Sequence, residues 1–107
     1  MYKMFVYGTL MKRHSNHDFL KNQRFIGKGL LKGYKMYRVV ISFPGIVKSS
    51  QIEDVVIGEV YEIDKKTLQN LDKLEGEGHM YKRVKENIIL EDNKELEAYV
   101  YEWVRQC

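Results

Sequence analysis

The sequence is poor in the residues that mark special architectures. Cysteine occurs once, at Cys107, and proline once, at Pro44. A single cysteine cannot form a disulfide within the chain, and it excludes a metal site built from several thiolates. We interpret the terminal thiol as a bystander and expect a reducing, cytoplasmic location.

Long apolar runs and a strong charge of one sign are also missing. No stretch approaches the roughly 18 residues of a membrane span, and Met1–Leu10 is too polar for a signal peptide, so we expect no membrane partner. The formal charge is only +3, and the longest basic cluster is Lys12-Arg13-His14. Because the basic residues do not cluster, we expect no nucleic-acid partner, with a small basic RNA-binding barrel kept as an alternative.

The composition is that of one globular domain over residues 1–107, with 44% hydrophobic and 31% charged residues. β-Type patterns dominate, and glycines inside them indicate a bent sheet. We expect a turn or an irregular sheet edge at Ser42–Gly45, where the proline lies, and a short helical turn before Phe19. The expected class is α+β with a curved, barrel-like sheet. Strands are predicted over Tyr2–Tyr7, parts of Phe25–Val40, Val55–Ile63, Tyr81–Leu90 and Leu96–Val104.

One main helix is predicted over Lys65–Glu75. Asp64 is a good N-cap, and Gly76 supplies the C-terminal stop. Ile63 and Leu68 have the spacing of a hydrophobic staple across the helix start.

Glu75 shares the apolar side of this helix, because at about 100° per residue it falls between Leu68 and Leu71. Burial and the negative end of the helix dipole would both raise its pKa, as a general acid/base near neutral pH requires. The alternative is a solvated last-turn glutamate. We interpret Asp72 as a solvated flank. His79 is interpreted as an exposed loop residue, with a second titrating group as the alternative.

The first predicted strand ends in the turn Tyr7-Gly8-Thr9-Leu10. A glycine there lets successive amides face outward, where they suit a carboxylate or an oxyanion, and Thr9 adds a hydroxyl. A tight turn without a ligand is the plainer alternative.

Tyrosine is frequent, with 8 in 107 residues. Tyr99, Tyr101 and Trp103 share one strand face, and Tyr81 lies on the strand before. Their rings suit aromatic packing, while one or two hydroxyls could line a binding site.

Together these segments resemble the gamma-glutamyl cyclotransferase-like family, which includes gamma-glutamylamine cyclotransferase and the AIG2-like and YtfP-like proteins. Seven short matches follow in the right order over nearly the whole chain. They are FVYGTL (5–10), NHDFL (16–20), FPGIV (43–47), GEVYEID (58–64), LDKLEG (71–76), YKR (81–83) and YVYEW (99–103).

The resemblance implies a mixed barrel-like sheet of about six strands and a cofactor-independent acyl transfer or lyase reaction without a metal. A small γ-glutamyl compound would be converted into 5-oxoproline and a free amine by a monomer or weak homodimer. Glu75 would be the catalytic acid/base. The substrate would be bound by Tyr7, Gly8, Thr9, Leu10, Tyr81 and Tyr101.

Two further alternatives keep the fold. The chain could be a non-catalytic small-molecule binding module, or it could act on a γ-glutamyl group attached to a carrier. The sequence does not identify the leaving amine.

Overall fold

Seven strands, two short 3₁₀ turns and one α-helix make up the part of the chain that the structure describes, residues 1–40, 43–78 and 80–104. The structure is a computed structural model. Ser42, His79 and Cys107 lie outside the described residues. The elements are β1 (Tyr2–Val6), η1 (Gly8–Leu10), η2 (His17–Leu20), β2 (Arg24–Lys32), β3 (Tyr34–Val40), β4 (Phe43–Lys48), β5 (Val55–Ile63), α1 (Lys65–Glu75), β6 (Tyr81–Leu90) and β7 (Glu95–Trp103).

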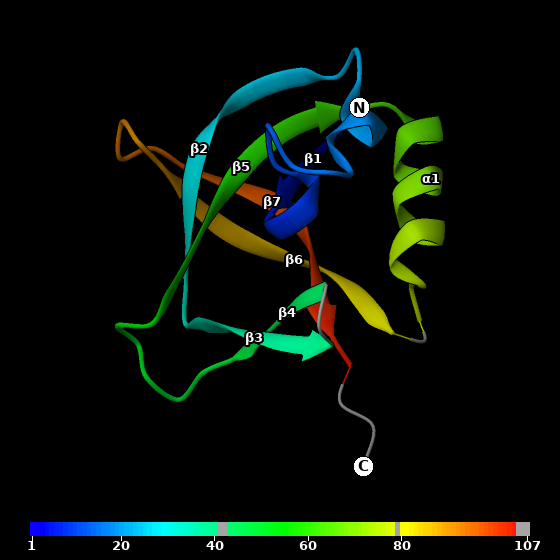
Figure 1. The fold of residues 1–107 in the computed structure, drawn as a ribbon. Helices are drawn as coiled ribbons and strands as arrows, with labels where there is room; N and C mark the ends of the chain where they lie inside the picture. The colour runs from blue at the N-terminus through cyan, green and yellow to red at the C-terminus, as the bar shows by residue number, and fades with distance from the viewer. Residues whose placement is uncertain (41–42, 79, 105–107) are drawn as a thin grey trace.

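Five of these strands close into a barrel in the order β1-β5-β2-β6-β7 (Figure 1). Neighbours are antiparallel except where β7 meets β1 in parallel, with Met4 opposite Tyr99. The expected mixed, barrel-like sheet is confirmed. The described residues hold seven strands rather than about six, because β3 and β4 form a separate two-stranded sheet.

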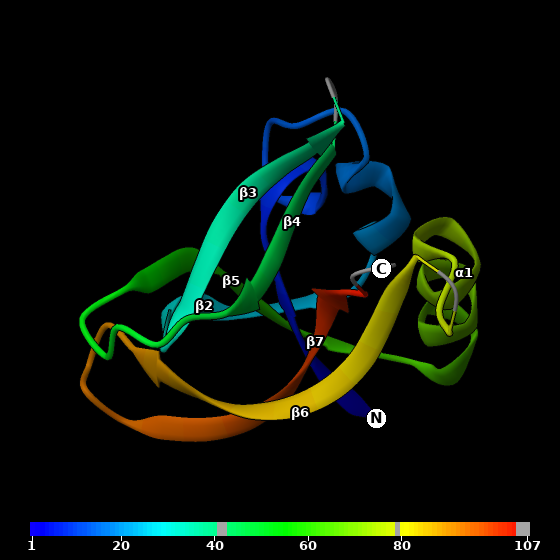
Figure 2. The same cartoon turned by 90° about the horizontal axis from the view of Figure 1, so that it is seen from below.

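The β3–β4 hairpin lies beside the barrel (Figure 2) and decides between two alternatives for the proline segment. Phe43, Pro44 and Gly45 belong to the edge strand β4, so the segment is an edge and the turn is not found there. A proline is tolerated there because both strands of a two-stranded sheet are edges, where one backbone donor can be lost. The predicted β segment 25–40 is divided at Gly33, whose φ of 79° reverses the chain between β2 and β3.

One hydrophobic cluster fills the barrel interior. It receives side chains from all five barrel strands, because alternate residues of each strand point inward. Tyr34 and Ile46 join it from the β3–β4 hairpin. Its buried members are Phe5, Leu31, Tyr34, Ile46, Val56, Val60, Ile88, Ala98 and Val100.

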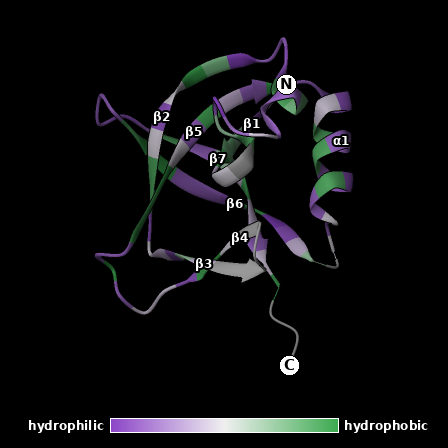
Figure 3. Cartoon of the chain, in the orientation of Figure 1, coloured by the Kyte–Doolittle hydropathy of each residue, from purple (hydrophilic) through white to green (hydrophobic). Residues whose placement is uncertain are grey.

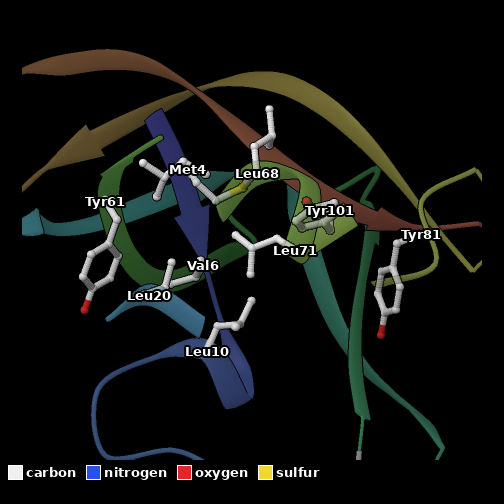
Figure 4. Packing of buried hydrophobic residues seen from close by; sticks show 10 residues of the cluster. Met4, Val6, Leu10, Leu20, Tyr61, Leu68, Leu71, Tyr81 and Tyr101 are labelled. Atoms are coloured by element: carbon white, nitrogen blue, oxygen red, sulfur yellow. The ribbon is translucent and has the colours of Figure 1, made fainter. Parts of the chain in front are cut away.

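A second cluster lies on the outer side of the barrel, where α1, η1 and η2 cover the strands (Figure 4). Leu68 and Leu71 of α1 are buried there against Met4 and Val6 of β1. Figure 3 shows the apolar and polar stripes that alternate around this helix. The cluster also takes in Leu10, Tyr81 and Tyr101, so the helix packs where the predicted site residues meet.

The ends of α1 follow from its sequence. The Asp64 carboxylate accepts from the backbone N–H of Thr67 at 2.7 Å, as an N-cap does. At the other end Gly76 adopts φ 63° and ψ 50°, and the N–H of Glu77 donates to the carbonyl of Asp72. This left-handed glycine, together with the hydrogen bond back to Asp72, ends the helix immediately after Glu75. Among the described residues, no helix is long and apolar enough to cross a membrane.

Gly58 allows two neighbouring strands to come together inside the barrel. A Cβ there would lie 2.3 Å from the Val6 carbonyl oxygen and 2.6 Å from the Phe5 ring. We expect Gly58→Ala to lower the free energy of unfolding by about 2 kcal/mol or more, because the backbone oxygen cannot move aside. Gly27→Ala is the control: its Cβ meets nothing within 4 Å, so a change within about 0.5 kcal/mol is expected. Urea unfolding measures both, and equal effects would contradict this description of the barrel.

Candidate active site

The carboxyl group of Glu75 lies half-buried at the end of α1. It is the last helical residue before the left-handed Gly76, one turn beyond the buried Leu71. Burial raises the pKa of this carboxyl from 4.5 to about 7. A carboxyl with that pKa is present in both protonation states near neutral pH, so it can accept a proton and return it.

Three phenols lie close enough to this carboxyl for its charge to act on them. Tyr7 follows β1, Tyr81 begins β6 and Tyr101 lies in β7. Burial raises the pKa of each phenol, and the nearby charge of Glu75 raises it further; for Tyr81 the pKa reaches about 12. All three therefore stay neutral at physiological pH, so these neighbours of the carboxyl are polar and uncharged.

Tyr7 connects this group to the turn that follows β1. Its hydroxyl donates to the backbone carbonyl of Tyr101 and takes part in a backbone hydrogen bond with Ile46. The next residue, Gly8, has φ 71° and begins η1. In a 3₁₀ turn the leading amides have no acceptor inside the turn. The amides of this turn thus follow directly on a residue whose hydroxyl senses the charge of Glu75.

The last two residues of the Tyr7–Leu10 turn differ in what they contribute. Leu10 is 3% exposed and packs in the cluster under α1, so its side chain anchors the turn. The ring nitrogen Nδ1 of His17 lies 3.1 Å from the Leu10 carbonyl oxygen and holds η1 against η2. The placement of the Thr9 side chain lies outside what the structure describes.

A buried glutamate that sequence reasoning missed also supports this turn. Glu59 of β5 is 5% exposed, and its Oε1 accepts from the backbone N–H of Lys12 at 3.0 Å and from the hydroxyl of Tyr61 at 3.1 Å. The carboxylate thereby fixes the segment after η1. A signal was present, because Glu59 alternates with Tyr61 and Ile63 on one strand face.

Asp72 is not the solvated flank that the sequence suggested. Its Oδ1 accepts from the Tyr101 hydroxyl at 2.6 Å. The buried Nε of Arg83 lies 3.0 Å from the same oxygen, off the line of a directed hydrogen bond, so this contact is an ion pair. Asp72 precedes Glu75 by three residues and therefore lies on the same side of the helix.

Further polar groups lie inside the barrel. The hydroxyl of Tyr34, which is 2% exposed, donates to Oε2 of Glu86 at 2.7 Å. Glu102 of β7 is close enough to raise the pKa of both Tyr34 and Tyr7. No local pattern predicts this group of side chains, since it forms only when β3, β6 and β7 meet.

The structure therefore brings Glu75, Tyr7, Tyr81 and Tyr101 together, with Gly8 next to them. The hydroxyls of Tyr7 and Tyr101 donate to protein acceptors. His79, the possible second titrating group, lies outside the described residues. Within residues 1–40, 43–78 and 80–104, no group of three or more His, Cys, Asp or Glu could hold a metal ion.

Comparisons with known proteins identify a family for this chain. The model of the family described as "Gamma-glutamyl cyclotransferase, AIG2-like" matches residues 4–107. A Methanocaldococcus jannaschii protein named "Putative gamma-glutamylcyclotransferase MJ1514" is 47% identical over 106 residues, which cover 97% of this chain and 86% of the relative. The Escherichia coli "Gamma-glutamylcyclotransferase family protein YtfP" is 35% identical over 81 residues, 76% of this chain and 68% of the relative.

The fold is shared with a solved structure of an AIG2-like protein from Mus musculus. The TM-score is 0.87 at 24% identity, and the match covers 100% of this chain and 80% of the mouse chain. A family model that spans nearly every residue, two relatives named for the same activity and the same barrel lead to one conclusion: the chain belongs to the gamma-glutamyl cyclotransferase, AIG2-like family.

Proposed function

We propose that this protein converts a γ-glutamyl amine or γ-glutamyl amino acid into 5-oxoproline and the free amine. The observation that carries the proposal is the half-buried Glu75 carboxyl, whose pKa is raised to about 7 beside Tyr7 and the turn that begins at Gly8. Membership of the family supports the same class of substrate.

In this reaction the substrate attacks itself. The α-ammonium gives a proton to the Glu75 carboxylate, and the resulting amine attacks the γ-carbonyl carbon. A new C–N bond closes a five-membered ring, and the carbonyl oxygen takes up negative charge. When that charge collapses, the bond to the leaving nitrogen breaks and Glu75 returns the proton to that nitrogen. The ring nitrogen gives up its second proton through water to the released amine, which leaves the ring amide of 5-oxoproline neutral and the amine as an ammonium product. Nucleophile and electrophile belong to one molecule, so the reaction has no need of a cofactor.

We assign the remaining work to the turn and the phenols. The amides of Gly8, Thr9 and Leu10 would bind the glutamyl group and stabilise the oxyanion, since preorganised backbone donors lose little in reorganisation. The ring of Tyr81 would line the same space. When the substrate is held in a folded conformation, its amine lies close to its own γ-carbonyl. Such orientation lowers the activation free energy of ring closure by several kcal/mol.

Glu75→Gln tests this mechanism directly. The amide cannot take the α-ammonium proton, so we expect kcat/KM to fall by about 100- to 10,000-fold. In the unaltered protein kcat/KM should rise with pH through a midpoint near 7, because only the carboxylate accepts a proton. The assay is 5-oxoproline release from a panel of γ-glutamyl compounds.

The control for this assay is Glu91→Gln, in the exposed turn between β6 and β7. It should keep full turnover. Full turnover of Glu75→Gln would contradict the mechanism. Ligand-dependent melting of the unaltered protein without any 5-oxoproline release would instead indicate a non-catalytic binding module.

Above neutral pH, Glu75→Gln should be more stable than the unaltered protein. The folded-state pKa of Glu75 lies above its unfolded value, so the folded protein binds more protons between about pH 4.5 and 7, and Glu75 lowers stability as pH rises through that window. We expect Glu75→Gln to raise the free energy of unfolding at pH 8 by up to about 3 kcal/mol. At pH 4 the two proteins should be about equally stable. Urea unfolding at both pH values checks this, and an unchanged difference across the range would contradict the burial of the carboxyl.

A further inference from the structure

We propose that Asp72 and Tyr101 form a positioning pair that holds the end of α1, and with it Glu75, at a fixed place against the Tyr7–Leu10 turn. The inference rests on the proposed role of Glu75 as the proton carrier. It assigns Tyr101 a part in the site that acts through Asp72 rather than by donating a hydrogen bond to substrate.

The first link joins the helix to β7. The Tyr101 hydroxyl donates to Oδ1 of Asp72 at 2.6 Å, and Tyr101 is only 3% exposed. Asp72 lies three residues before Glu75, on the same side of the last helical turns. Whatever fixes Asp72 therefore also fixes the direction in which Glu75 leaves the helix.

The second link joins β7 to the turn after β1. The Tyr7 hydroxyl donates to the backbone carbonyl of Tyr101, and Tyr7 leads directly into Gly8. Tyr101 thus holds the helix through its side chain and the start of the Tyr7–Leu10 turn through its main chain. The proton carrier and the amide-bearing turn are both located relative to one residue.

Arg83 completes the attachment from β6. Its Nε lies 3.0 Å from Asp72 Oδ1, and its guanidinium stacks over the Tyr99 ring with 4.6 Å to the ring centre. Its backbone N–H faces Oε2 of Glu77 at 3.3 Å, so the segment after the helix is held by the same residue. The positive charge of Arg83 balances the negative charge of Asp72. The carboxylate one turn before Glu75 is therefore neutralised by an ion pair.

The pair should affect the rate more than substrate affinity. The Tyr101 proton already has an acceptor in Asp72, and burial together with that bond raises the pKa of the phenol, so it stays a neutral donor. A displacement of about 1 Å at the reacting atoms can cost roughly 100-fold in rate. Loosening the helix end would produce such a displacement without removing a contact to substrate.

Tyr101→Phe and Asp72→Ala test the pair. Each should lower kcat by about 10- to 100-fold with KM within about threefold. Because both remove one bond, the double variant should lie within about threefold of the slower single variant. Asp72→Asn should recover most of the rate, since its amide oxygen can still accept from Tyr101. Tyr37→Phe, on an exposed ring of β3, and Asp92→Ala, in an exposed turn, are the matched controls.

A second readout needs no substrate. The charge of Glu75 is sensed by Tyr7 of the β1 end, Tyr81 of β6 and Tyr101 of β7, and all three stay neutral below pH 9. A titration of the Glu75 side-chain carboxyl carbon by NMR is therefore not complicated by ionisation of these phenols. The titration midpoint of Glu75 should fall from near 7 toward 4.5 in Asp72→Ala and Tyr101→Phe, because the released helix end lets the carboxyl reach water.

Four results would overturn the pair: a wild-type kcat in Tyr101→Phe, a raised KM with kcat unchanged, losses that multiply in the double variant, or an unshifted Glu75 midpoint. Absence of 5-oxoproline release from the unaltered protein would contradict the proposed function instead. In that case the NMR titration still decides whether Asp72 and Tyr101 hold the carboxyl in place.

Discussion

The burial of one carboxyl group at the end of α1 is the physical constraint on which the site depends. Glu75 loses water, and burial is the cause of its raised pKa; within residues 1–40, 43–78 and 80–104 no cation forms a salt bridge with it. A structural glutamate would be more stable in solvent, so the fold retains an unfavourable feature at this position. Such local costs are typical of functional sites, where activity takes precedence over stability. The three phenols near Glu75 are polar and add no charge of their own at neutral pH.

The barrel supplies the other half of the site through the way it closes. β1 and β7 run in parallel, so their ends arrive at the same edge, and the residues there are Tyr7 and Tyr101. The helix packs outside these two strands and brings Glu75 to the same edge. Tyr101 bonds to both partners, to Asp72 through its hydroxyl and to Tyr7 through its carbonyl. A cyclisation that needs a proton carrier and an oxyanion site at a fixed separation would benefit from such a common support.

Local features were predictable from the sequence, and non-local ones were not. The bounds of α1 follow from Asp64 and Gly76, which act on their own helix ends, and the position of Glu75 on the wheel follows from the buried Leu68 and Leu71. The Asp72–Tyr101 bond joins residues 29 apart, and Glu59 meets Lys12 across 47 residues, so neither leaves a local pattern. Barrel closure and the place of the β3–β4 hairpin likewise depend on pairings that periodicity does not encode. The glycines did signal curvature, but the number of strands in the barrel came only from the structure.

The most direct test of the central claim is a titration of the Glu75 side-chain carboxyl carbon in the unaltered protein, selectively labelled with ¹³C and followed by NMR. If the carboxyl is buried as described, its titration midpoint lies near pH 7. A midpoint near 4.5, the ordinary value for a solvated glutamate, would show that the carboxyl is not buried and would contradict the account.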